Sequence, residues 1–255
     1  MTTIPRIEVQ HVTKSFSDRG QRLLALEDVS FAVGQKEFVT LIGPSGSGKS
    51  TLFNLIVGLQ QPDHGTISLN GTVTQDRTGK VGYMPQRDLL LPWRNVLDNV
   101  LVAQEVQGVP REVARQRARR LLPSFGLEGF AHAYPTALSG GMRQRAALLR
   151  TVLTERDLLL LDEPFGALDA LTRRELQDWL LGLWEQLSIT VLFITHDVEE
   201  ALYLGDRVLV FAPRPGRILE TLQVLLPRPR RQGMVASPEF GLQAEALLRA
   251  LGVRT

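Results

Sequence analysis

The chain has 255 residues, of which 29 are basic and 27 acidic, and its formal net charge is +2. This near-neutral balance gives no support to a protein that coats a polyanion, so we expect no nucleic-acid partner. The absence of cysteine excludes disulfide scaffolds, Cys-liganded zinc sites, iron–sulfur clusters and thiol nucleophiles.

Short apolar or alternating runs predict β-strands, and the segments between the later runs predict helices. This order favours one α/β domain over residues 1–255, with a mixed or parallel sheet, helices and an antiparallel β part. No apolar run approaches the roughly 20 residues of a membrane span, and no signal-peptide core begins the chain, so we expect a cytoplasmic location. The predicted strands cover residues 7–12, 29–33, 38–42, 66–69, 81–84, 158–161, 191–194 and 208–211.

Residues 43–50 read G-P-S-G-S-G-K-S, between a predicted strand at 38–42 and a predicted helix at 49–57. This pattern in a strand–loop–helix context is typical of the phosphate loop of a P-loop NTPase core. Backbone N–H groups would bind phosphate oxygens, Lys49 would reach the β- and γ-phosphates, and the Ser50 hydroxyl would ligand Mg²⁺. The residues predicted to bind ATP here are Gly43, Ser45, Gly46, Ser47, Gly48, Lys49, Ser50 and Thr51.

Residues 87–156 are mostly helical in pattern, and we expect them to form a helical subdomain inserted into the core. In the predicted helix 111–125, the apolar side chains share one face. Arg111, Arg115 and Arg119 lie on the other face at i, i+4 spacing. This Arg stripe is typical of a solvated helix face, and a nucleic-acid contact is the alternative.

Four leucines at 158–161 end in Asp162 and Glu163, as in a buried parallel strand whose carboxyl end faces a ligand. We predict that Asp162 holds Mg²⁺ through water. We predict that Glu163 is the general base for a water that attacks the γ-phosphate. A pair of acidic residues at the start of a helix is the alternative interpretation.

His196 follows an apolar strand predicted over 190–195. At the carboxyl end of a strand in a nucleotide-binding fold, it can bond the γ-phosphate and position Glu163 or its water. A structural histidine is the alternative, and it is our interpretation of the other histidines, His11, His64 and His132.

The tail, residues 213–255, begins with several Pro and Arg residues. This composition predicts a poorly packed connection to the rest of the domain. Residues 239–251 then show the pattern of a short terminal helix.

Residues 138–145 read L-S-G-G-M-R-Q-R and precede a predicted helix that runs to residue 153. Ser139 is a good helix N-cap, and the two glycines permit close approach of a phosphate. Taken alone, Ser-Gly-Gly is a common loop sequence, but here it stands just ahead of the strand that carries Glu163. From about residue 7 to residue 211, the ordered motifs resemble the ATP-binding subunits of ABC transporters.

The resemblance implies that two copies of the chain dimerise head to tail. ATP would lie between the phosphate loop of one copy and the signature motif, residues 138–145, of the other. It also implies that Gln86 is a catalytic residue that senses Mg²⁺ and the attacking water, and that Asp169 lies in the loop crossing the dimer interface. Phe16 matches the aromatic that stacks on adenine, although Tyr is more usual there and a core Phe is the alternative. The signature residues assigned to ATP are Ser139, Gly140 and Gly141, in trans, together with Gln144.

Residues 86–100, which contain Leu-Pro-Trp, resemble the importer subgroup that serves nitrate, sulfonates and taurine. The resemblance implies a transmembrane permease subunit, one of whose cytoplasmic helices enters a groove between Gln86 and the signature motif. A periplasmic or extracellular solute-binding protein would be an indirect partner. The chain would then be peripheral on the inner face of the cell membrane. For Trp93, an anchor of the helical subdomain is the alternative to a contact with the permease.

Three other functions remain as alternatives. The first is an importer subunit for a thiamine precursor or another small solute. The second is a non-transport ABC ATPase acting on DNA or ribosomes, which would usually carry a second nucleotide unit or a long coiled coil. The third is a small-molecule P-loop kinase, which needs an acceptor-binding lid and does not need residues 139–141.

Overall fold

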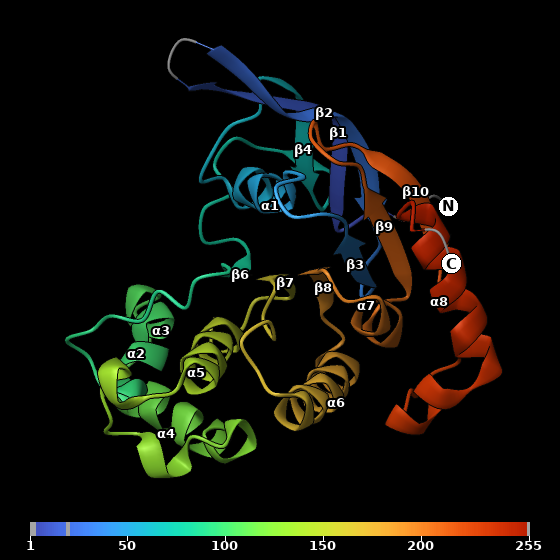
Figure 1. Cartoon of the computed structure of the whole chain (residues 1–255). Helices are drawn as coiled ribbons and strands as arrows, with labels where there is room; N and C mark the ends of the chain where they lie inside the picture. The colour runs from blue at the N-terminus through green and yellow to red at the C-terminus, as the bar shows by residue number, and fades with distance from the viewer. Residues whose placement is uncertain (1–3, 19–20, 254–255) are drawn as a thin grey trace.

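The chain folds into two β-sheets and a set of helices (Figure 1). The structure is a computed structural model that describes residues 4–18 and 21–253. The smaller sheet is antiparallel, with the strand order β2-β1-β4-β5. The larger sheet has the order β10-β9-β3-β8-β7-β6, in which β9 to β6 run parallel and β10 is an antiparallel edge strand. The strands are β1 (Ile7–Asp18), β2 (Gln21–Val33), β3 (Phe38–Ile42), β4 (His64–Leu69), β5 (Thr72–Val73), β6 (Gly82–Met84), β7 (Leu158–Asp162), β8 (Thr190–Thr195), β9 (Arg207–Phe211) and β10 (Ile218–Gln223).

The helices occupy two places in this arrangement. Helix α1 packs between the two sheets, whereas α2 to α5 gather in a group apart from the antiparallel sheet (Figure 1). No helix of the described ranges is long and apolar enough to span a bilayer. The α-helices are α1 (Lys49–Val57), α2 (Val96–Val100), α3 (Val102–Val106), α4 (Arg111–Leu121), α5 (Gly140–Val152), α6 (Ala170–Leu187), α7 (Val198–Leu204) and α8 (Pro238–Ala250). The predicted α/β core with an antiparallel part and a helical insertion is confirmed.

The leucine run of β7 explains why its strand is central. Leu158 and Leu160 pack in the core that faces α1 and the antiparallel sheet. Leu159 and Leu161 pack in a second core on the opposite face, with the helices. Because successive side chains of a strand point to opposite faces, a strand covered on both sides must be apolar throughout.

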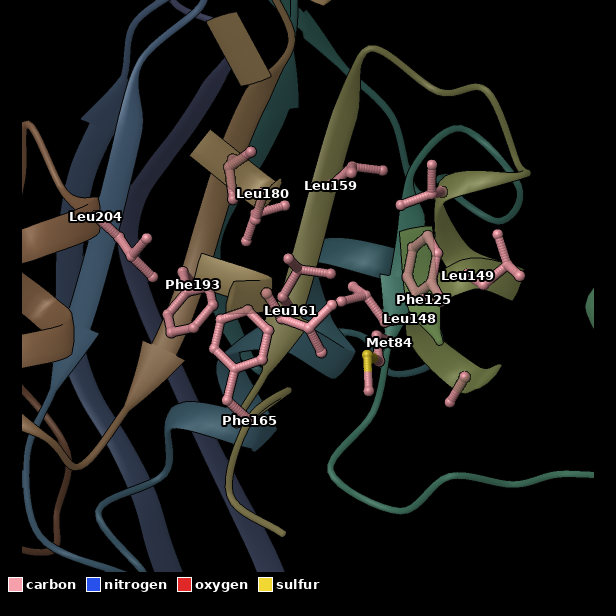
Figure 2. Close-up of a cluster of buried hydrophobic side chains, with 14 of the residues drawn as sticks. Met84, Phe125, Leu148, Leu149, Leu159, Leu161, Phe165, Leu180, Phe193 and Leu204 are labelled. Atoms are coloured by element: carbon pink, nitrogen blue, oxygen red, sulfur yellow. The ribbon is translucent and has the colours of Figure 1, made fainter. Parts of the chain in front are cut away.

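The second core joins the helical region to the sheet. Figure 2 shows Leu161, Phe165 and Phe193 from the sheet side lying near Met84 and the α5 leucines Leu148 and Leu149. The Phe165 and Phe193 rings are 5.6 Å apart between centroids. Burial of this much apolar surface fixes α5, and therefore the segment that precedes it, relative to the end of β7.

The tail differs from the sequence prediction of a poorly packed connection. Residues Ile218–Gln223 form β10 and pair with β9. The Arg228 guanidinium lies 4.2 Å from the centre of the Trp184 ring. Buried Arg230 donates to the carbonyl oxygens of Leu202, Tyr203 and Gly205 at the end of α7. The prediction was wrong because these Arg side chains are structural, and they satisfy carbonyls that a helix end leaves open.

Helix ends also differ from the predicted bounds. The helix predicted over 111–125 ends at Leu121, and a 3₁₀ turn, Pro123–Phe125, follows it. Proline lacks the N–H group that an α-helix needs, which explains the change. The strand predicted over 29–33 begins earlier, at Gln21, because its first half pairs with the extended end of β1.

Candidate active site

The loop between β3 and α1 has a backbone shape that requires glycine at two positions. A Cβ at Gly43 would lie 2.7 Å from the Phe211 carbonyl oxygen. Gly48 has a φ of +93°, and a Cβ there would lie 2.8 Å from the Ala25 carbonyl oxygen. These contacts hold the loop close against β9 and β2. The loop leads directly into α1, and the N–H groups at a helix N-terminus stabilise an anion.

Lys49 places its cation inside this loop. Its Nζ donates to the carbonyl oxygens of Gly43 at 2.8 Å and Pro44 at 2.9 Å. Burial lowers the pKa of Lys49, whereas the charges on Glu163 and Asp162 raise it. The ammonium is therefore held by the loop itself, where it experiences the negative charge of both carboxylates.

Asp162 ends β7 as a buried carboxylate. It is 1% exposed, and neither of its oxygens has a hydrogen-bond partner among the described residues. Burial raises the pKa of Asp162 to about 6; the charge on Glu163 acts in the same direction, and the Ser50 hydroxyl and Lys49 act against it. Free carboxylate oxygens beside a hydroxyl suit a hard cation that keeps most of its water, as Mg²⁺ does. In residues 4–18 and 21–253, no three acidic or histidine side chains lie close enough together to hold a metal ion by themselves.

Glu163 lies at the meeting point of three segments. Its Oε2 accepts a hydrogen bond from Gln86 Nε2 at 3.1 Å and lies 3.4 Å from His196 Nδ1. Its backbone has a φ of +48°, a left-handed conformation that is rare for a residue with a long side chain. The structure thus brings together the three residues to which the sequence assigned catalysis.

A cavity of about 210 Å³ lies over the phosphate loop. It is bounded by the loop, by Gln86 and Glu163, and by a residue to which the sequence assigned no role, Arg214. Arg214 could not be found from the sequence, because it lies far along the chain in a Pro-rich turn. The lining residues from the loop are Ser45, Gly46, Ser47, Gly48, Lys49, Ser50 and Thr51.

The signature residues lie elsewhere. Ser139 and Gly140 are exposed at the start of α5, and neither lines the phosphate cavity of its own chain. The Ser139 hydroxyl caps α5 by accepting from the Met142 N–H at 3.2 Å, and Gly141 is half-buried next to it. The buried Gln144 amide donates to the Glu163 carbonyl oxygen at 2.9 Å, which ties α5 to the end of β7.

An ion pair that the sequence did not suggest also holds α5. Arg143 Nε lies 3.1 Å from Asp88 Oδ2, two residues after Gln86. Arg150, further along α5, donates to the carbonyl oxygens of Asp88 and Leu89. The segment that carries Gln86 is therefore fastened to the helix that carries the signature motif.

The structure also places the remaining predicted residues. Asp169 is fully exposed and caps α6, and the hydrogen bond it accepts from the Thr172 N–H lowers its pKa. Phe16 is half-buried on β1 and belongs to neither hydrophobic core, so the alternative of a core Phe is not what the structure shows. Trp93 is 71% exposed, which argues against an anchor of the helical region.

A larger, mostly apolar groove of about 670 Å³ adjoins the site. It shares Ser50, Gln86 and Asp162 with the site, and it extends past Leu59 and Leu89 to α3. Both leucines are more than half exposed. Exposed apolar surface of this kind is a feature that interaction sites and ligand-binding grooves share.

Comparison with known proteins gives matches along most of the chain. Residues 26–166 match the family described as ABC transporter. The taurine import ATP-binding protein TauB of Pseudomonas aeruginosa is 42% identical over 248 residues, which cover 95% of this chain and 94% of that protein. The formylaminopyrimidine import ATP-binding protein ThiZ of Halalkalibacterium halodurans is 46% identical over 229 residues, 89% of each chain. A dimeric structure of the ATP-binding cassette MJ0796, in a post-hydrolysis state bound to ADP and Pi, matches with a TM-score of 0.78 and 30% identity. It covers 87% of this chain and 100% of that one.

Proposed function

This chain belongs to the ABC transporter family, and we propose that it drives the uptake of a small sulfonate, taurine or a related anion such as nitrate. As an ATP-binding subunit of an importer it hydrolyses ATP, forms a homodimer and works with a membrane permease. One observation carries the proposed mechanism: the Glu163 carboxylate meets Gln86 and His196 at the edge of the phosphate loop.

The phosphate loop would hold ATP through its N–H groups and Lys49. The residues at the loop fit a magnesium ion, with the Ser50 hydroxyl, Gln86 and, through water, Asp162 around it. Such an ion would neutralise charge on the phosphate oxygens. Phe16 would stack on the adenine base. Its partial exposure on β1 is consistent with that role.

Glu163 would take the proton from the water that attacks the γ-phosphate. Gln86 donates to its carboxylate, and His196 lies within reach of the same oxygen, so both side chains orient the base.

The site is completed by a second copy of the chain. Ser139, Gly140 and Gly141 are at an exposed helix start and would bind the γ-phosphate held by the partner copy. Asp169, exposed at the start of α6, would lie at the same interface. Gln144 would position Glu163 and not contact the nucleotide directly, because its amide joins the signature helix to the backbone of Glu163.

We propose that the groove beside Gln86 receives an amphipathic cytoplasmic helix of the permease, on the inner face of the membrane. Its lining is mostly apolar, and it shares Ser50, Gln86 and Asp162 with the catalytic centre. A helix seated there would contact the residues that change with ATP hydrolysis. The solute-binding protein would act on the permease from the other side of the membrane.

The test is to reconstitute the homodimer with its permease and solute-binding protein in liposomes and to measure ATP hydrolysis. Taurine or another sulfonate should stimulate hydrolysis. Stimulation by formylaminopyrimidine alone would favour the thiamine-precursor alternative, which the identity to ThiZ supports. Hydrolysis that never depends on a permease or a solute would contradict the importer function.

A further inference from the structure

The turn that joins β9 to β10 is fastened to the nucleotide side of the antiparallel sheet. The Gly216 N–H donates to the Ala25 carbonyl oxygen at 2.9 Å, and the Glu27 N–H donates to the Gly216 carbonyl oxygen at 2.9 Å. The Ala212 N–H donates to the Arg217 carbonyl oxygen at 2.9 Å and closes the turn. Residues 213–217 therefore hold a set position over β2.

The same turn packs directly on the phosphate loop. A Cβ at Gly216 would lie 3.1 Å from both the Ser47 carbonyl carbon and Leu26 Cδ2, closer than side chains normally approach. Only glycine fits this contact without a shift of the backbone. The contact fixes the distance between the turn and the loop that would hold the phosphates.

Arg214, the second residue of this turn, lines the phosphate cavity together with the loop, Gln86 and Glu163. No ion pair or hydrogen bond joins its side chain to any residue in the described part of the chain. Its neighbour Arg217 differs, because it lies 4.0 Å from Glu27 and away from the cavity. The turn thus presents one arginine to the phosphate loop and pairs the other on the surface.

The phosphate cavity has a second basic side chain besides the lysine of the loop. Lys49 and Arg214 are the basic residues in its lining, and the Lys49 ammonium already donates to the carbonyl oxygens of Gly43 and Pro44 within the loop. A guanidinium carries five donors in a planar fork that matches two phosphate oxygens at once. A polyphosphate is therefore the ligand that this cation and this cavity suit.

We infer that Arg214 binds the phosphate chain of the nucleotide and clamps it against the loop from the β9–β10 side. This inference rests on the proposed function, because it takes ATP as the ligand. Arg214 adds a contact that the phosphate-loop pattern does not contain. It also explains why a Pro-rich turn is fixed so firmly beside the loop.

The test uses the full chain and isothermal titration with Mg-ATP and Mg-ADP. Arg214→Ala should weaken binding of both nucleotides by about tenfold, the loss typical of one charge-assisted contact. Arg214→Lys should fall between wild type and Arg214→Ala, because it keeps the charge and loses the fork. The difference between wild type and Arg214→Ala should shrink as salt rises, since salt screens the charge.

Arg217→Ala is the matched control, because it removes an arginine from the same turn but not from the cavity. If Arg217→Ala weakens binding as much as Arg214→Ala, or if Arg214→Ala binds like wild type, the inference is overturned. Lys49→Ala distinguishes a failure of the Arg214 contact from a failure of ATP binding itself. If Lys49→Ala loses ATP binding and Arg214→Ala does not, the role of Arg214 is rejected and the proposed function stands. If the wild-type chain binds no ATP, the proposed function itself is rejected.

Discussion

At the scale of single residues, Glu163 is contacted by three other residues to which a role at the site is assigned. Gln86 and His196 meet its carboxylate, and Gln144 meets its carbonyl oxygen. Glu163→Gln keeps the size and the hydrogen bonding of the side chain but removes the base. We expect ATP binding to stay near wild type and hydrolysis to fall by about 10²- to 10⁴-fold.

Steady-state phosphate release and nucleotide titration on the same preparation measure the two effects of Glu163→Gln. Glu175→Gln is a suitable control, since it neutralises an exposed carboxylate on α6, outside the cavity. Hydrolysis at the wild-type rate in Glu163→Gln would rule out this residue as the base.

Asp162 predicts a pH dependence of stability. Burial raises the pKa of Asp162 in the folded chain to about 6, from an ordinary value of 3.8. A group with a raised folded pKa favours the fold fully below the ordinary value, and that contribution is lost as pH rises through the folded value. Above pH 6, the ionised carboxylate is therefore a cost to the chain when nucleotide and magnesium are withheld.

Asp162→Asn removes this ionisation. We expect its free energy of unfolding to exceed that of wild type by up to about 3 kcal/mol at pH 7.5, and by roughly half as much at pH 5. Urea unfolding at the two pH values, with nucleotide absent and metal chelated, measures the gap. A gap that does not change between pH 5 and pH 7.5 would contradict a buried, raised carboxylate.

At the scale of elements, α5 connects the parts of the site. Its start is the signature motif, its middle bonds Glu163 through Gln144, and Arg143 pairs with Asp88 in the Gln86 segment. Ser139→Arg would place a long cation where the partner's γ-phosphate is proposed to bind. We expect ATP to bind single subunits normally and hydrolysis to fall to a few per cent or less.

Loss of the N-cap in Ser139→Arg costs about 1 kcal/mol, which is too little to unfold the chain. Ser237 gives the matched control, since its hydroxyl caps α8 by accepting from the Phe240 N–H, far from any motif. Ser237→Arg should lose similar stability and keep hydrolysis. If both variants hydrolyse ATP equally well, the site in trans is wrong.

The elements also show how far the sequence could lead. The phosphate loop and the strand β7 could be predicted, because each is a continuous local pattern: a glycine-rich loop before a lysine, and a run of leucines that only a strand covered on both faces requires. Strand β10 could not, because Pro and Arg residues around it suggest solvent, while the pairing with β9 comes from the sheet. Arg214 was missed for a similar reason, since the contact of Gly216 with the phosphate loop joins segments that are far apart in the chain.

At the scale of the whole molecule, the apolar groove next to the site predicts how the subunit meets its permease. Leu89 is 57% exposed and lines the groove. Leu89→Glu would put a charge into the apolar contact, and we expect assembly with the permease to weaken by about tenfold or more. Co-purification of the permease with the tagged subunit measures this loss.

Val106 provides the control for this experiment, because it is 84% exposed on α3 and does not line the groove. Val106→Glu should assemble like wild type. Equal assembly of Leu89→Glu and wild type would move the permease to another surface of the subunit.

The left-handed backbone of Glu163 has a consequence for engineering. A residue with a side chain at a φ of +48° costs the fold on the order of 1 kcal/mol or more, and glycine or asparagine would relieve it. A library selected for heat resistance alone would therefore drift to Gly or Asn at position 163. Such variants would outlast the natural chain on heating and no longer turn over ATP, so thermostability screens on this protein need a selection for activity at every round.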